Sequence, residues 1–164
     1  MCSSDLPWGR PLILLSPDPY HHDAMVRQLI RIGYDRLNGY LAGGMDGWKT
    51  SGLPVEAADG IDVDTLKELW GQEPAPMILD VRQRSEYHAG HIQGALNIEL
   101  GELQEHLDGL PREIPVVTVC ASGMRASVAG SILQRDGRQN VQVVGVGGTQ
   151  DWIDRGFPIA TGDE

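Results

Sequence analysis

One cysteine of this chain, Cys120, lies between a predicted strand and a predicted helix. The apolar run Val116–Val119 predicts a buried strand, and Cys120 follows it directly. The next five residues read as a tight loop that opens a helix, so the pattern is C-x-x-G-x-R and ends at Arg125. The first N–H groups of a helix have no partner inside it and lie at the positive end of its dipole. We therefore expect a ring of amides that holds the Cys120 sulfur as a thiolate.

Each part of this loop has an expected role. Cys120 is the expected nucleophile, and Gly123 allows the loop to curl so that its N–H groups point inward. Arg125 adds positive charge at the rim, and two serine hydroxyls can donate hydrogen bonds. The expected substrate-binding set is Ala121, Ser122, Gly123, Met124, Arg125 and Ser127. A buried structural cysteine is the alternative, and the reactive interpretation requires a sulfur that solvent can reach.

An internal repeat indicates which elements position this loop. Residues 43–55 (GGMDGWKTSGLPV) match residues 147–159 (GGTQDWIDRGFPI) at an offset that runs without a gap back to Pro11 and Pro115. In both copies a short apolar strand, an amphipathic helix, a glycine stop and a second strand follow one another. In the second copy the apolar helix face is expected to comprise Met124, Val128, Ala129, Ile132 and Leu133. The first copy lacks its front half, so we expect an incomplete unit at 1–57 and a complete domain at 58–164.

The first copy lacks the chemistry of the second. Ser16 replaces the cysteine, Pro19 the glycine and His21 the arginine. Pro17 and Pro19 remove two N–H donors, and Asp18 puts a negative charge where an anion would bind. We expect this copy to be catalytically inert.

The rest of the chain alternates strands and helices. Gly52–Asp62 reads as a linker, and Asp62 is expected to cap a helix at 63–70. Strands are expected at 77–81 and 95–98, and a further helix at 100–107. This alternation predicts an α/β fold, a mainly parallel sheet with helices on both faces, whose ligands bind beyond the carboxyl ends of the strands.

Composition excludes several classes of function. The 164 residues carry a net charge of −10, which argues against nucleic acid as a partner. No apolar run is long enough to span a membrane, so no membrane partner is expected. The two cysteines, Cys2 and Cys120, form no disulfide framework or zinc cluster, and they favour a reducing, cytoplasmic location.

Three stretches resemble the rhodanese-homology domain, the fold of sulfurtransferases. They are residues 78–82 (ILDVR) with 86–98, the Cys120–Arg125 loop, and Gly147-Gly148 with Trp152, Gly156 and Pro158. The resemblance implies a rhodanese-like α/β fold and a sulfurtransferase in which Cys120 carries a sulfane sulfur as a persulfide. It implies a small donor such as thiosulfate or a low-molecular-weight persulfide, and a thiol, cyanide or sulfite as acceptor. No cofactor and no metal are expected.

Two other functions stay open. A cysteine phosphatase or arsenate reductase of the same fold is one, although related phosphatases use C-x5-R and this loop is one residue shorter. A non-catalytic sulfur-binding or regulatory module is the other. The inert copy also resembles the middle domain of fusions with a metallo-β-lactamase-like domain, so such an upstream domain is a possible partner in the parent chain.

Other polar residues are expected to be structural. Asp80 and Arg82 end the strand beside Cys120 and are assigned supporting roles, with Asp80 accepting backbone hydrogen bonds and Arg82 pairing with Glu86. His88 and His91 form an H-x-x-H pair without further ligands at a suggestive spacing, so no metal site is expected.

Overall fold

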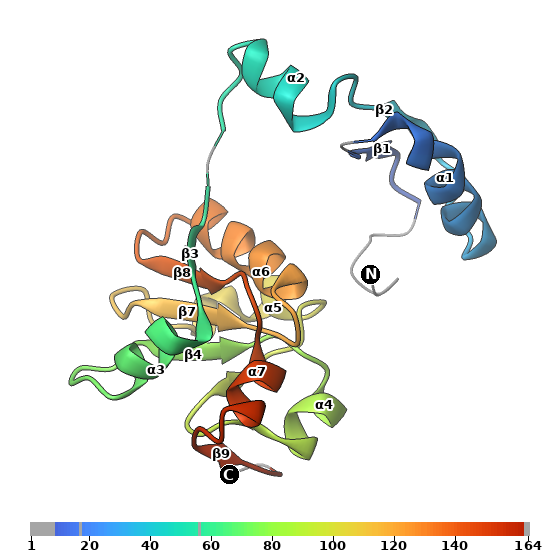
Figure 1. Cartoon of the computed structure of the whole chain (residues 1–164). Helices are drawn as coiled ribbons and strands as arrows, with labels where there is room; N and C mark the ends of the chain where they lie inside the picture. Colours follow the sequence, from blue (N-terminus) through green and yellow to red (C-terminus); the bar gives the residue numbers. More distant parts are fainter. Residues whose placement is uncertain (1–8, 17, 56, 163–164) are drawn as a thin grey trace. The chain divides into compact units, whose positions relative to one another are not determined.

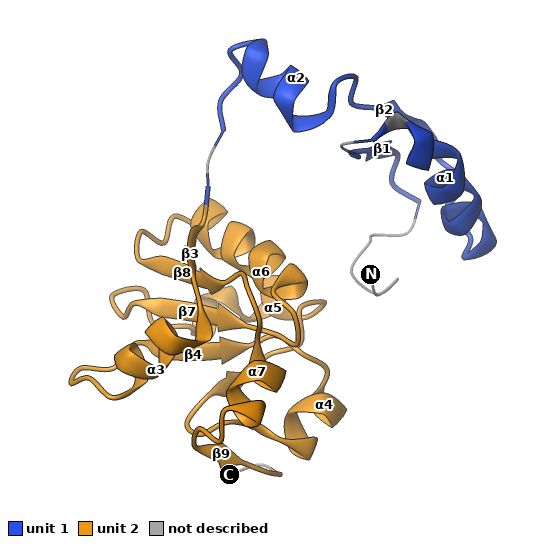
Figure 2. Cartoon of the chain, in the orientation of Figure 1, with its two compact units in different colours: residues 1–57 blue, residues 58–164 orange. Residues whose placement is uncertain are grey.

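The computed structural model describes residues 9–16, 18–55 and 57–162, and the chain divides into two compact units. Unit 1 comprises residues 1–57 and unit 2 residues 58–164 (Figure 2). Cys2 and Pro17, which entered the sequence argument, lie outside the described residues. Each unit is described by itself below.

Unit 2 is built on a five-stranded parallel sheet (Figure 1). The strands lie in the order β3-β8-β7-β4-β6, so β7, which precedes Cys120, is central. Their bounds are β3 Asp59–Ile61, β4 Met77–Asp80, β6 Leu96–Asn97, β7 Val116–Val119 and β8 Val141–Val144. All four strand pairs run parallel. A separate antiparallel pair joins β5 (His91–Ile92) to β9 (Ile159–Ala160). The carboxyl ends of the parallel strands therefore gather at one edge.

Helices cover both faces of this sheet, which agrees with the burial of every side chain of β7. In β7 the side chains of Val117 and Val119 belong to one core cluster and that of Val116 to the other. The cluster that holds Val116 is closed by α5 and α6, and the cluster that holds Val117 by α3, α4 and α7. Their bounds are α3 Val63–Trp70, α4 Arg84–Ala89, α5 Leu103–His106, α6 Met124–Arg135 and α7 Thr149–Asp154, and a 3-10 turn, Leu107–Gly109, follows α5. The predicted α/β arrangement, a mainly parallel sheet between helices, is confirmed.

Several local predictions hold because local signals decide them. Asp62 is extended at the N-terminus of α3, and its carboxylate accepts the amide of Thr65 at 2.8 Å. A side chain that accepts an unpaired amide of the first helical turn is the usual N-cap.

The predicted helix at 100–107 is shorter than expected. Regular α-helix spans only Leu103–His106.

Two predictions are wrong for reasons of tertiary packing. Part of the predicted linker, Asp59–Ile61, is strand β3, which pairs with β8 at the sheet edge. The predicted apolar face of α6 is right for Ala129 and Leu133 but wrong for Met124 and Val128, which are 64% and 50% exposed. Its buried residues are Ala126, Ala129, Gly130 and Leu133. Small residues face the sheet because α6 lies close to it: a Cβ on Gly130 would meet a Val143 methyl at 2.5 Å.

Unit 1 contains β1 (Leu12–Leu14), a 3-10 turn at Pro19–His21, α1 (His22–Arg31), β2 (Leu37–Tyr40) and α2 (Gly44–Thr50). Strand, helix, strand and helix follow one another as β7, α6, β8 and α7 do in unit 2. The ends of the two stretches also correspond, because the indole of Trp48 donates to the Pro54 carbonyl at 2.9 Å and that of Trp152 to Pro158 at 2.8 Å. No helix in the described part of the chain is long and apolar enough to cross a membrane.

Candidate active site

Cys120 lies at the carboxyl end of β7, between the strand and α6. The Gly123 amide donates to its Sγ at 3.1 Å, which places the sulfur inside the curled loop. The backbone on the other side is held too, since the Cys120 carbonyl accepts the amide of Thr149 at 2.9 Å. The sulfur therefore meets a main-chain donor at the start of a helix, where a negative charge is stabilised.

Two glycines allow this loop to close. Gly123 has a φ of +89°, and a Cβ there would lie 2.5 Å from the Gly145 carbonyl oxygen. At Gly148 a Cβ would lie 2.2 Å from the Cys120 carbonyl oxygen. The loop after β7 and the loop after β8 thus contact each other through backbone alone, and a side chain at either position would push them apart.

The Cys120 thiol is buried, contrary to the expectation of a sulfur that solvent reaches. The residue is 1% exposed, whereas Ala121 and Ser122 next to it are exposed. The sequence placed the cysteine correctly at the end of a strand but gave no signal for what covers it. A segment distant in sequence lies against the backbone of the cysteine, since a Cβ on Gly148 would meet the Cys120 carbonyl oxygen.

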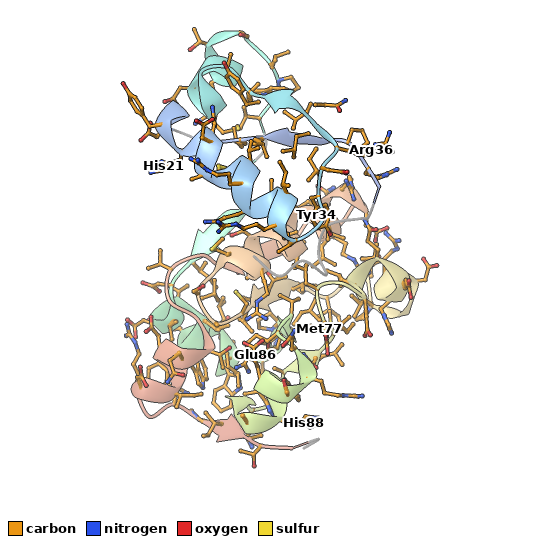
Figure 3. The ribbon with its side chains drawn as sticks, turned by 90° about the vertical axis from the view of Figure 1, so that its right-hand side faces the viewer. His21, Tyr34, Arg36, Met77, Glu86 and His88 are labelled. Atoms are coloured by element: carbon orange, nitrogen blue, oxygen red, sulfur yellow. The ribbon has the colours of Figure 1, made fainter. Side chains whose placement is uncertain are left out.

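Arg125 is paired with Glu86 of α4. Its two terminal nitrogens donate to the two carboxylate oxygens at 2.7 and 2.8 Å. The hydrogen-bonded guanidinium holds the pKa of Glu86 below its usual value, and the carboxylate in turn raises the pKa of Arg125. Figure 3 labels Glu86 on α4, the helix that follows β4. The positive charge expected at the rim is therefore balanced by a carboxylate from a distant part of the chain.

Asp80 and Arg82 form a second, buried ion pair. The Arg82 Nη2 donates to Asp80 Oδ2 at 2.7 Å and to the Gly90 carbonyl at 2.9 Å. Asp80 Oδ1 also accepts the Arg82 amide at 3.0 Å, and the Asp80 side chain is fully buried. The predicted pairing of Arg82 with Glu86 is wrong, since Glu86 bonds Arg125. These hydrogen bonds between Asp80 and Arg82 fix the position of the segment between β4 and α4.

The remaining loop residues are placed as follows. Met124 begins α6 and is exposed, and so are Ala121 and Ser122. The Ser127 hydroxyl donates to the Gly123 carbonyl at 2.9 Å, so it holds the loop and is not directed at the sulfur. Sequence reasoning missed Glu86 as a partner of this loop. Its place in the stretch 86–95 was the available signal, but nothing local assigned it to Arg125.

The H-x-x-H pair lies apart from this chemistry. His91 is fully buried, its ring stacks on Tyr87 with centroids 3.6 Å apart, and its Nδ1 donates to the Tyr87 carbonyl at 2.9 Å. Among the described residues, no group of three or more His, Cys, Asp or Glu is placed to hold a metal ion.

The fold and the loop together define an α/β domain with a cysteine at a strand-to-helix junction, and comparisons identify its family. A model of the rhodanese-like domain matches residues 62–155. The chain therefore belongs to the rhodanese-like domain family.

Individual relatives agree with this assignment. The putative sulfur carrier protein YrkF of Bacillus subtilis is 32% identical over 92 residues, 56% of this chain and 49% of YrkF. The thiosulfate sulfurtransferase GlpE of Coxiella burnetii is 30% identical over 76 residues, 46% of this chain and 70% of GlpE. The crystal structure of a rhodanese-related protein from Thermoplasma volcanium is 31% identical with a TM-score of 0.55, covering 63% of this chain and 99% of that one. The chain spans about half the length of YrkF.

Proposed function

We propose that residues 58–164 form a sulfurtransferase in which Cys120 carries a sulfane sulfur as a persulfide. The observation that carries the proposal is the Gly123 amide 3.1 Å from Sγ at the N-terminus of α6. That position stabilises a sulfur anion before and after the transfer. Relatives named as a sulfur carrier and a thiosulfate sulfurtransferase support the same chemistry.

The reaction has two balanced halves. The Cys120 thiolate attacks the outer sulfur of a donor such as thiosulfate or a low-molecular-weight persulfide. The donor S–S bond breaks, its electron pair leaves with sulfite or a thiolate, and Cys120 retains the terminal sulfur as a persulfide anion. A thiol, cyanide or sulfite then attacks that terminal sulfur and regenerates the thiolate. No cofactor and no histidine base enter either half, and the thiolate requirement favours a reducing compartment such as the cytoplasm.

Burial of Cys120 adds a condition to this reaction. With Cys120 only 1% exposed, the proposal requires the loop to move enough for a donor to reach the sulfur. Ala121 and Ser122 are the exposed residues of the loop, so the opening is expected to begin there. A displacement of this kind is a gating step and is expected to contribute to the rate of loading from every donor.

Intact-mass measurement with a sulfur donor tests the proposal. We expect the protein to gain one sulfur atom, which cyanide removes as thiocyanate. The Cys120→Ser variant is expected to gain none, and Cys2→Ser, which removes the chain's other thiol, is the matched control that keeps the gain. Unchanged loading of Cys120→Ser would contradict the assignment, and hydrolysis of p-nitrophenyl phosphate without loading would favour the phosphatase alternative.

Unit 1 is proposed to be an inert partial copy of the same fold. In place of the cysteine loop, the Ser16 hydroxyl donates to the Asp18 carbonyl at 2.9 Å. The Asp18 carboxylate accepts the Tyr20 amide at 2.9 Å and lies 3.4 Å from Nδ1 of His21. The Tyr20 amide, which could otherwise face an anion, is thus already bonded to the Asp18 carboxylate. This bond supports the proposal that unit 1 carries out no sulfur chemistry.

A further inference from the structure

Two arginines that follow the carboxyl ends of β4 and β7 are paired with carboxylates. Arg125 gives both terminal nitrogens to Glu86, and Arg82 gives its guanidinium to Asp80. The exposed loop position next to the cysteine is Ala121, which carries no charge. The positive charges of Arg125 and Arg82 are therefore cancelled by the negative charges of Glu86 and Asp80. The chain as a whole has a net charge of −10. A doubly charged anion that approaches this loop finds no unpaired guanidinium from these two residues, and the net charge of the chain repels it.

Exposed apolar side chains border the same loop. Met124 follows Gly123 directly and is 64% exposed, and Val128 lies one helical turn further on at 50%. Val146 is 77% exposed and follows Gly145, whose carbonyl oxygen lies against Gly123. Single exposed apolar residues are common, but Met124 and Val146 flank one contact between two loops, and Val128 lies one turn beyond Met124. They place exposed apolar side chains next to the loop that holds Cys120.

We propose that this site takes its sulfur from donors in which the sulfane sulfur is attached to an organic group and which carry at most one negative charge. Thiosulfonates and organic persulfides fit this description, and thiosulfate, a dianion without an organic group, does not. The inference rests on the proposed sulfurtransferase function and names its substrate class. With a thiosulfonate, Cys120 Sγ bonds to the terminal sulfur, the S–S bond breaks and its electron pair leaves with the sulfinate. The charge is −2 on both sides, and no external oxidant or reductant is needed.

A series of three probes tests the charge and the organic group separately. Thiosulfate, methanethiosulfonate and benzenethiosulfonate differ in charge or in apolar area but deliver the same sulfur atom. Loading of Cys120 is followed by intact mass, and each rate constant is divided by that of the same probe with the amino acid cysteine, which removes intrinsic reactivity. We expect benzenethiosulfonate to load fastest and thiosulfate slowest.

Two variants separate the two causes. Glu86→Gln leaves Arg125 without its carboxylate and is expected to speed loading from thiosulfate about five-fold. This factor corresponds to an attraction of about 1 kcal/mol between the freed guanidinium and the approaching anion in water. The matched control is Glu113→Gln, which removes the same charge before β7, at the opposite end of that strand from Cys120. Met124→Ser is expected to slow loading from benzenethiosulfonate more than loading from thiosulfate.

The outcomes are distinguishable. Normalised loading from thiosulfate that equals or exceeds that from both thiosulfonates would overturn the inference while leaving the sulfurtransferase proposal intact. The same holds if Glu86→Gln and Glu113→Gln change thiosulfate loading alike. If none of the three probes adds sulfur to Cys120, the proposed function itself fails. Circular dichroism of each variant checks that the fold is retained, and the wild-type series decides the order of donors without any variant.

Discussion

Glu86 and Arg125, which lie on different helices, are joined by two hydrogen bonds of 2.7 and 2.8 Å between carboxylate and guanidinium. Glu86 lies on α4, and Arg125 lies in the first turn of α6 next to the Cys120 loop. This pair couples the stretch that follows β4 to the loop that follows β7. It therefore links the position of the cysteine loop to the ionisation of a carboxylate on another element.

The Glu86–Arg125 pair should make stability depend on acid pH. The pKa of Glu86 is lowered from 4.5, mainly by the hydrogen bond from Arg125. A carboxyl group whose pKa is lower in the folded state stabilises that state above its unfolded pKa. Its contribution is therefore complete near neutral pH and is lost as pH falls through the folded pKa. Urea unfolding of wild type and Glu86→Gln from pH 7 to pH 3 should show a difference at pH 7 that shrinks towards pH 3.

Because the pair is partly exposed, its contribution is small. Its side chains are 25% and 35% exposed, so we expect about 1 kcal/mol or less between wild type and Glu86→Gln at pH 7. A difference that stays constant over this pH range would show that Glu86 does not act through its charge.

Gly123→Ala should destabilise the protein more than the replacement of a glycine elsewhere that has nearly the same φ. Gly123 has a φ of +89° and its Cβ would lie 2.5 Å from the Gly145 carbonyl oxygen. Gly137 has a φ of +90° and nothing within 4 Å of its Cβ, so Gly137→Ala is the matched control. We expect about 1 kcal/mol for the control and about 2 kcal/mol or more for Gly123→Ala, measured by urea unfolding. Equal losses would mean that the two loops separate at no cost.

Asp80→Ala should be among the most damaging substitutions outside the cysteine loop. Asp80 is fully buried, and its removal leaves the Arg82 guanidinium buried beside only a carbonyl partner. Breaking a buried pair in this way costs about 3–5 kcal/mol. Asp64→Ala, which breaks the exposed pair with Arg155, is the control and should cost about 1 kcal/mol or less. Similar unfolding midpoints for the two variants would rule out a structural role of this size for Asp80.

Residues 58–164 should fold and load sulfur without unit 1. Both hydrophobic clusters of unit 2 are formed by residues of that unit, with Leu79 and Val116 in one and Ile78 and Val117 in the other. A domain with its own core is expected to unfold cooperatively. Thermal melting and donor-dependent mass gain of the isolated segment check this. A segment that melts without cooperativity would show that unit 1 is required for folding.

Signals from residues close together in the sequence determined most of the fold and the position of the cysteine. The apolar run of β7, the helix stop at Gly137 and the Asp62 cap of α3 each depend on neighbours within a few residues. Such signals are readable because backbone conformation and capping are short-range effects. The C-x-x-G-x-R loop belongs to the same class, since one segment of chain supplies the cysteine, the glycine and the start of the helix.

Only the tertiary structure decided which charges meet and what reaches the sulfur. Nothing near Glu86 in the sequence selects Arg125 over Arg82 as its partner, and nothing near Asp59 indicates that β3 joins β8 at the sheet edge. The Cys120 backbone is likewise held by a segment distant in sequence, since the Thr149 amide donates to the Cys120 carbonyl at 2.9 Å. Ion pairing and burial are sums over groups brought together in space, so the pattern along the chain places each residue on an element but leaves its environment to the packing of the whole unit.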